Sequence, residues 1–200
     1  MRSLARFLLN SSTSQLLKKK KMTKEYTLTV FTEHQTGMLS RVVSIFTRRY
    51  INIESLTTSK SSMPGIHRFT IVVNTTEDMV RKLCGQLEKQ VDVLKAFYDD
   101  NDEIVYQEIA LYKIPTQKFM QGNRLEKLIR QHNAKVLEIE EEYIIVEKTG
   151  HAEETEALLE ALKEIGIFEF VRSGRVAIPR PMERLSKYLR QLELEAEETL

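Results

Sequence analysis

The sequence predicts an α+β protein in which the order strand, helix, strand, strand, helix, strand occurs twice. Three observations predict it. Apolar and polar residues alternate in short runs rich in Thr, Val and Ile, and apolar residues recur at helical spacing between those runs. A polar break, Asp99-Asp-Asn-Asp102, separates two such series. The halves share no obvious residue identity, so only the architecture is expected to repeat.

The first half begins with an alternating run in which Tyr26, Leu28 and Val30 share one face of a strand. Gly37 interrupts the alternation and precedes a stripe at helical spacing. Pro64-Gly65 marks a hairpin turn, and Thr75 with Asp78 has the spacing of a capping box. The expected elements are a strand at 26–32, a helix at 38–46, strands at 51–59 and 66–74, a helix at 79–87 and a strand at 91–98.

The second half repeats this order, and its second helix opens with Glu153, Glu154 and Glu156, where negative charge suits the helix dipole. Each half is long enough for one small sheet covered on one side by two helices. A sheet with one bare face usually finds a partner surface, which predicts an oligomer. The expected elements are a strand at 104–114, a helix at 125–129, a hairpin of 135–140 with 143–148, a helix at 157–165 and a strand at 168–178.

Four segments are therefore expected: a disordered basic leader at 1–24, domains at 25–99 and 103–179, and a C-terminal helical tail at 181–200. The leader resembles an organelle transit peptide in its Arg, Ser and lack of acidic residues, but a disordered extension is the favoured interpretation. The tail carries a narrow apolar stripe that either docks a partner or folds back on its own domain. The stripe consists of Met182, Leu185, Leu189 and Leu192.

Charge and composition exclude several function classes. Residues 1–24 hold seven basic and no acidic side chains, so the remainder carries 30 − 7 = 23 basic against 29 acidic residues. This acidic body argues against a nucleic-acid-binding protein. One cysteine excludes an internal disulfide, and no apolar run approaches the ~20 residues of a membrane helix. A cytoplasmic protein without a membrane partner is expected.

The sequence contains no recognisable catalytic or metal-binding pattern. The histidines at 34, 67, 132 and 151 lack metal-ligand spacing, and Gly37 stands alone without the other glycines of a phosphate-binding loop. Cys84 lies on an apolar helix stripe and is expected to be a buried, inert thiol. An enzyme that uses Cys84 is the weaker alternative, and a binding or regulatory protein is predicted.

The stretch from Phe31 to Leu56 is the expected functional centre. Gly37 places free backbone N–H groups at a helix start, a geometry that suits a small ligand with a carboxylate. Asn52 is expected to return beside this turn at the start of the next strand. His34 either donates to such a carboxylate or is an exposed bystander, and the residues leave both interpretations open.

Five segments of this sequence together resemble one known family. They are Thr36-Gly-Met-Leu-Ser-Arg-Val43, Phe46-Thr-Arg-Arg49, Asn52-Ile-Glu-Ser-Leu56, Gln86-Leu-Glu-Lys-Gln-Val-Asp-Val93 and Val171-Arg-Ser-Gly174. The family is the small regulatory subunit of acetolactate synthase (acetohydroxyacid synthase), and the resemblance covers about residues 26–178. It implies two ferredoxin-like β-α-β-β-α-β domains in tandem, the first an ACT domain that binds amino acids and the second a related fold.

The resemblance implies a chain without catalytic activity of its own. Such a chain binds the large catalytic subunit, activates it and confers feedback inhibition by valine in the biosynthesis of branched-chain amino acids such as valine and isoleucine. Thiamine diphosphate, Mg²⁺ and FAD would belong to that partner, with no cofactor on this chain. A free-standing ACT-type amino-acid sensor or adaptor acting on a different enzyme is the alternative.

In the family, valine binds between two ACT domains of a homodimer, at the turn before the first helix and at the asparagine of the second strand. Where the family pattern has asparagine three residues before the glycine, this chain has His34, and where glycine often follows the helix it has Tyr50. The positions carried over as effector-binding are His34, Thr36, Gly37, Met38, Leu39, Asn52 and Ile53.

Overall fold

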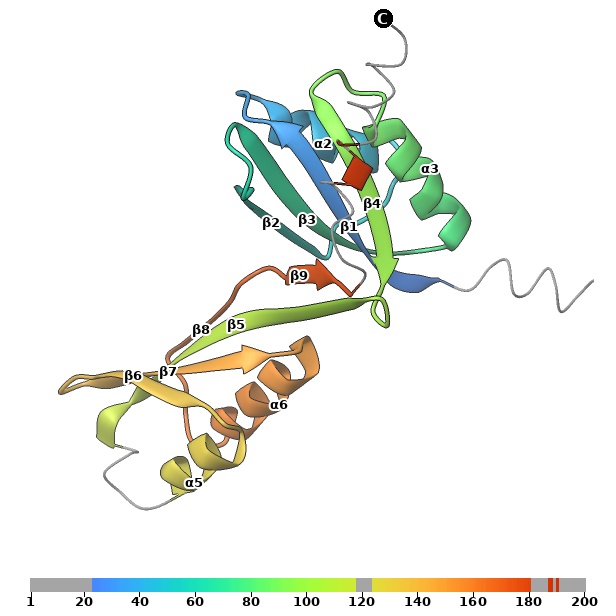
Figure 1. Ribbon diagram of the computed structural model, residues 1–200. Helices are drawn as coiled ribbons and strands as arrows, with labels where there is room; N and C mark the ends of the chain where they lie inside the picture. The colour runs from blue at the N-terminus through green and yellow to red at the C-terminus, as the bar shows by residue number, and fades with distance from the viewer. Residues whose placement is uncertain (1–22, 118–123, 181–186, 189, 191–200) are drawn as a thin grey trace, which may run out of the picture. The chain divides into compact units, whose positions relative to one another are not determined.

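The computed structural model describes residues 23–117, 124–180, 187, 188 and 190 (Figure 1). The chain divides into an N-terminal unit, residues 1–105 with 179–200, and a C-terminal unit, residues 106–178. Each unit is built on an antiparallel sheet with helices, so the predicted α+β class is confirmed. The expected leader lies almost wholly outside the described residues, and so does most of the expected tail helix.

The N-terminal unit contains a four-stranded antiparallel sheet in the order β2-β3-β1-β4. Strand β1 is central and pairs with β3 on one side and β4 on the other, so β2 and β4 are the edge strands. The order β-α-β-β-α-β is as predicted. The elements are β1 (Lys24–Glu33), α2 (Met38–Thr47), β2 (Ser55–Lys60), β3 (Ile66–Thr75), α3 (Glu77–Leu87) and β4 (Val93–Asp100).

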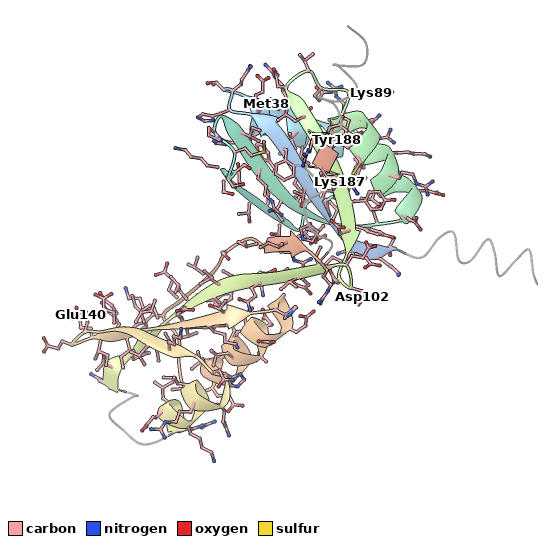
Figure 2. All side chains as sticks on the ribbon, viewed as in Figure 1. Met38, Lys89, Asp102, Glu140, Lys187 and Tyr188 are labelled. Carbon is pink, nitrogen blue, oxygen red and sulfur yellow. The ribbon has the colours of Figure 1, made fainter. Side chains whose placement is uncertain are left out.

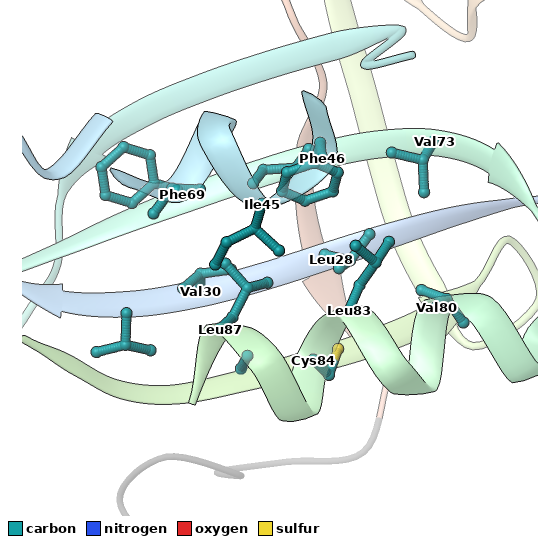
Figure 3. Close-up of a cluster of buried hydrophobic side chains, with 14 of the residues drawn as sticks. Leu28, Val30, Ile45, Phe46, Phe69, Val73, Val80, Leu83, Cys84 and Leu87 are labelled. Atoms are coloured by element: carbon teal, nitrogen blue, oxygen red, sulfur yellow. The ribbon is translucent and has the colours of Figure 1, made fainter. Parts of the chain in front are cut away.

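Both helices of this unit pack against one face of the sheet, and this layer forms the hydrophobic core (Figure 3). Alternate residues of β1 supply its floor, because side chains of a strand point to opposite faces in turn. Apolar positions three and four apart on α2 and α3 supply its cover. The labelled members in Figure 3 are Leu28, Val30, Ile45, Phe46, Phe69, Val73, Val80, Leu83, Cys84 and Leu87.

The C-terminal unit repeats the architecture with the strand order β6-β7-β5-β8, and β9 also pairs with β5. The hydroxyl of Tyr112, which is fully buried, donates a 2.6 Å hydrogen bond to the carbonyl oxygen of Thr155. Burial raises the pKa of Tyr112 to about 12, so the hydroxyl stays protonated. The elements are β5 (Ile104–Pro115), α5 (Arg124–Gln131), β6 (Lys135–Ile139), β7 (Tyr143–Gly150), α6 (Ala152–Lys163), β8 (Glu169–Arg172) and β9 (Val176–Pro179).

The single last strand expected at 168–178 is wrong, because the chain forms two short strands separated by residues 173–175. At the break, the N–H of Ser173 donates to the carbonyl oxygen of Ile109, and the hydroxyl of Ser173 accepts the N–H of Ile109 in place of a backbone carbonyl. Arg172, which precedes the break, donates to the hydroxyl of Thr155 at 3.3 Å and pairs with Glu108 at 3.5 Å. The Arg-Ser-Gly segment thus joins β8 to β5 and to the first turn of α6.

Two boundaries in the first half also differ from expectation. Strand β2 begins at Ser55 rather than at residue 51. The residues before it, including Ile51 and Ile53, pack against the core as a connecting segment that does not pair with a strand. The capping box expected at Thr75 is absent, since α3 begins one residue later with Thr76 at its N-cap and no side-chain cap bond. Glu77 and Asp78 still occupy its first turn, where they suit the helix dipole.

Helix α2 ends in a left-handed turn at Tyr50, whose φ is 54°. The N–H of Tyr50 donates to Thr47 and that of Ile51 donates to Phe46, the bond pair of a Schellman motif. Asn133 ends α5 in the same way with φ 51°, donating to Arg130. Glycine is usual at such a position and asparagine is tolerated, but a tyrosine carries the steric cost of the left-handed conformation.

Within the described residues, no helix has both the length and the apolar character needed to cross a membrane.

We expect Tyr50→Gly to stabilise the chain by about 1 kcal/mol, because it removes the left-handed penalty and the side chain is 97% exposed. Urea denaturation measures the change in the free energy of unfolding. Asn133→Gly is the matched control in the same motif, and its gain should be smaller because asparagine already tolerates this conformation. An equal gain at both positions would contradict the explanation.

Candidate functional site

The turn between β1 and α2 is held by backbone hydrogen bonds and by the conformation of Gly37. Gly37 has φ 85° and forms the N-cap of α2 without a side-chain cap bond. The N–H of His34 donates to the carbonyl oxygen of Gly65 at 3.0 Å, which ties the turn to the β2–β3 hairpin. A Cβ atom at Gly37 would meet no atom within 4 Å, so the backbone conformation, not space, calls for glycine.

The first amides of α2 are available to a ligand. In the described part of the chain, the N–H groups of Gly37, Leu39 and Ser40 donate to no other group, and that of Met38 makes only a long 3.5 Å contact with Gln35. The first turn of α2 also contains no acidic residue. The positive end of the helix dipole therefore faces solvent without compensation, as an anion-binding helix start requires.

The predicted site residues differ in what their side chains offer. Met38 is 3% exposed and belongs to the core, so it anchors α2 and only its backbone is open to a ligand (Figure 2). Leu39 is 46% exposed, and Thr36 is exposed as well. Asn52 is exposed, whereas Ile53 is half-buried against the core. Leu39 thus offers an exposed apolar side chain and Asn52 an exposed carboxamide. A small amino acid could contact the first with its side chain and the second with its charged groups.

The expectation that Asn52 returns beside the Gly37 turn is wrong within one chain. The turn follows Glu33, which pairs with Ile66 at one end of the sheet. Asn52 precedes Ser55, which pairs with Val72, and Val72 pairs with Thr27 at the other end of β1. Six residues of β1 separate Thr27 from Glu33, about 20 Å of strand. The two parts of the predicted site lie at opposite ends of the sheet.

His34 does not stand free in the turn, because its ring stacks on His67 of β3. The ring centroids are 4.0 Å apart and the planes differ by 12°. His67 pairs with Thr32 and with Lys60 on the two neighbouring strands, and its Nε2 atom is buried without a hydrogen-bond partner among the described residues. His67 is not predictable as a neighbour of His34 from the sequence, because only the strand register brings the two together.

Burial first, and then the neighbouring charges of His34 and Lys60, lower the pKa of His67 below its usual value. A low pKa favours the neutral imidazole in the folded chain. Two neutral rings can stack closely, whereas two imidazolium ions at this distance would repel each other. Protonation of His67 therefore opposes the burial of its ring beside His34.

Cys84 is buried and its pKa is raised to about 12, chiefly by burial, so the inert thiol predicted from the sequence is confirmed. Such a thiol is protonated near neutral pH and is a poor nucleophile. Within the described ranges, no three His, Cys, Asp or Glu side chains gather where they could hold a metal ion.

We expect the His34–His67 pair to make stability fall as the pH drops. The unfolded chain takes up a proton on residue 67 near pH 6.5, whereas the folded chain does so only at lower pH, so acid favours unfolding in that window. Urea denaturation at about pH 7.5 and about pH 5 should show a larger loss for the native sequence than for His67→Gln. Equal losses in the two proteins would contradict the assignment.

Comparison with known proteins agrees with this fold. Residues 28–95 match the family model described as the AHAS small subunit-like ACT domain, and residues 107–181 match the one described as the small subunit of acetolactate synthase. The "Acetolactate synthase small subunit" of Bacillus subtilis is 37% identical over 155 residues, which cover 77% of this chain and 88% of that protein. The protein of the same name from Mycolicibacterium smegmatis is 35% identical over 158 residues. These residues cover 79% of this chain and 92% of that protein.

A solved structure gives the same result. The acetolactate synthase small subunit of Thermotoga maritima superposes with a TM-score of 0.72 at 26% identity, covering 80% of this chain and 99% of that one. Both sheets of the present chain thus have counterparts in one known family, which confirms the tandem ferredoxin-like architecture with an N-terminal ACT domain. The chain belongs to the acetolactate synthase small-subunit family.

Proposed function

We propose that this chain binds the large catalytic subunit of acetolactate synthase, raises its activity and makes it sensitive to feedback inhibition by valine. Membership of the small-subunit family supports the catalytic subunit as the partner. The observation that supports an amino-acid effector is the start of α2 at Gly37, where no acidic side chain neutralises the positive end of the helix dipole. Catalysis and its cofactors (thiamine diphosphate, Mg²⁺ and FAD) belong to the partner, in the cytoplasm. The chain itself contributes binding free energy that depends on the effector.

The carboxylate, isopropyl and ammonium groups of valine each have a possible partner among the predicted site residues. Its carboxylate accepts hydrogen bonds from the free N–H groups of Gly37 and Leu39. Its isopropyl group contacts the exposed side chain of Leu39, and the carboxamide of Asn52 can accept from the ammonium group or donate to the carboxylate. His34 and Thr36 line the turn, and Ile53 lies beside Asn52.

A second copy of the chain resolves the separation of Gly37 from Asn52. Strand β2 is an edge strand, and pairing it with the β2 of a second copy about a two-fold axis extends the sheet and buries both edges. The two β2 strands then run antiparallel, so the Gly37 end of one chain lies at the Asn52 end of the other. Each homodimer would contain two equivalent valine sites, each built from both chains.

Inhibition requires valine to bind one arrangement of the holoenzyme better than the other. Coupling of this kind is typically ~1–3 kcal/mol, which corresponds to a change of about 5-fold to 150-fold in affinity. Activation of the catalytic subunit need not use the valine site, so the two effects are separable by substitution.

We expect Gly37→Asp to abolish valine inhibition of the reconstituted holoenzyme while the chain still activates the catalytic subunit. The added carboxylate repels the carboxylate of valine at the helix start. Gly37→Asn is the matched control, because it has the same shape and tolerates the same φ but carries no charge. Activity assayed with and without valine measures both effects. Full inhibition of the Gly37→Asp holoenzyme would contradict the site, and failure of the native chain to activate would contradict the function.

The shared site predicts complementation between two defective chains. Gly37→Asp and Asn52→Ala homodimers should each lack valine inhibition. Mixing the two chains gives roughly half mixed dimers, in which one site carries both substitutions and the other carries neither. Partial inhibition should therefore return on mixing and refolding. If each site lay within one chain, every site in a mixed dimer would carry one defect and inhibition would stay absent.

A further inference from the structure

The surface of the N-terminal unit is hollowed between the end of α2 and the last turn of α3, with a volume of about 400 Å³. Three of the lining side chains are basic, two are carboxamides, and one, Ile45, belongs to the core. No acidic side chain is among them. We call this surface the basic hollow. Its lining residues are Ile45, Arg48, Arg49, Gln86, Lys89 and Gln90.

The three cations of the basic hollow are not neutralised by carboxylates of the same chain. None of them forms an ion pair with another described residue. The two acidic residues nearest to Lys89 in the sequence pair elsewhere: Glu88 with Lys95 at 2.8 Å, and Asp92 with Arg41. The hollow therefore concentrates unpaired positive charge on a chain that is acidic overall after residue 24.

Arg49 is held in place by side chains of the opposite helix. Its Nε donates to the side-chain oxygen of Gln86 at 2.7 Å, and its Nη1 lies 3.7 Å from the sulfur of Met79, about two turns away on α3. Arg48 and Lys89 are exposed and follow the ends of the two helices, where the helix dipole favours a cation. The hollow thus combines one positioned guanidinium with two cations that can move toward a partner.

The lining of the basic hollow differs from that of a small-molecule site. Such sites are lined mostly by apolar and aromatic side chains, whereas this hollow has one apolar lining residue and no aromatic one. Phosphate sites on helices use free backbone N–H groups. Here the N–H groups at the two helix ends already donate to carbonyl oxygens of the same chain, namely those of Arg48, Arg49, Glu88 and Gln90. Side-chain cations remain, which suit a surface that presents carboxylates.

We propose that the basic hollow docks a segment of the catalytic subunit that presents several Asp or Glu side chains. This inference rests on the proposed function, because it names where and by which chemistry the proposed partner binds. The acidic balance of the chain disfavours a nucleic acid as the occupant. The hollow lies between the two helices and not at the β2 edge, so the proposed homodimer does not use it.

Helix α2 joins this docking site to the proposed effector site. Gly37 is the N-cap of α2, and Arg48 is its C-cap. The ten residues between them span about 15 Å of helix. A partner docked at the basic hollow therefore contacts the same rigid element whose first amides are open to valine.

Association kinetics with the purified catalytic subunit test the docking site. Arg48→Glu with Lys89→Glu should lower the association rate constant about tenfold at about 0.05 M salt, and the difference should nearly vanish at about 0.5 M salt, because salt screens exposed charges. Arg81→Glu with Lys82→Glu is the matched control, since it makes the same change in net charge at exposed positions of α3 outside the hollow. It should leave the rate constant within about twofold of the native value.

The two possible failures are distinguishable. A native chain that does not bind the catalytic subunit would contradict the proposed function, and this inference with it. A native chain that binds, with equal association rates for the two double variants at every salt concentration, would overturn the docking site alone.

A zero-length cross-link tests the chemistry of the partner segment. A water-soluble carbodiimide joins a lysine amine to a carboxylate only where the two groups are in contact. In the native complex it should join Lys89 to an Asp or Glu of the catalytic subunit, as peptide mass mapping will detect, whereas Lys82 of α3 should give no such product. Absence of the Lys89 product would overturn the proposal, and binding of inorganic phosphate by the isolated chain would then assign the hollow to a small anion.

Discussion

The crossover of α2 from β1 to β2 is the constraint on which the rest of the N-terminal unit depends. A helix that leaves the end of a strand and packs on its sheet must run back toward the start of that strand. Gly37 therefore lies at one end of the sheet and Asn52 at the other, as the pairing of Glu33 with Ile66 and of Ser55 with Val72 records. In the proposed valine site, which uses both ends, a second chain supplies the end that the first chain cannot reach.

The same crossover leaves the sheet with two unlike faces. One face is filled by the two helices and forms the core, and the other carries Thr27, Val72 and Asp99, buried without any help from those helices. An antiparallel sheet tolerates a solvated face only if that face is polar, and the Phe31–Phe97 pair makes this one partly apolar.

Two departures from the family pattern stand at the two ends of α2, and the structure accommodates each by a different physical means. At the start, His34 stacks on His67, and the lowered pKa of His67 disfavours a positive charge on that ring. At the end, Tyr50 adopts φ 54°, and its backbone bond to Thr47 offsets part of the steric cost.

The element order, the two sheets, the core stripe through Leu83 and Leu87, the buried Cys84 and the glycine turn can all be predicted from the sequence, because each depends on local periodicity or on one residue's conformational range. The break at Ser173, the His34–His67 stack and the separation of Asn52 from Gly37 emerge only in the folded chain. These three depend on strand register and on the direction of a crossover, which relate residues far apart in the chain. The Gly37 turn is predictable from the sequence. The location of Asn52 at the opposite end of the sheet becomes known only from the pairing of the strands.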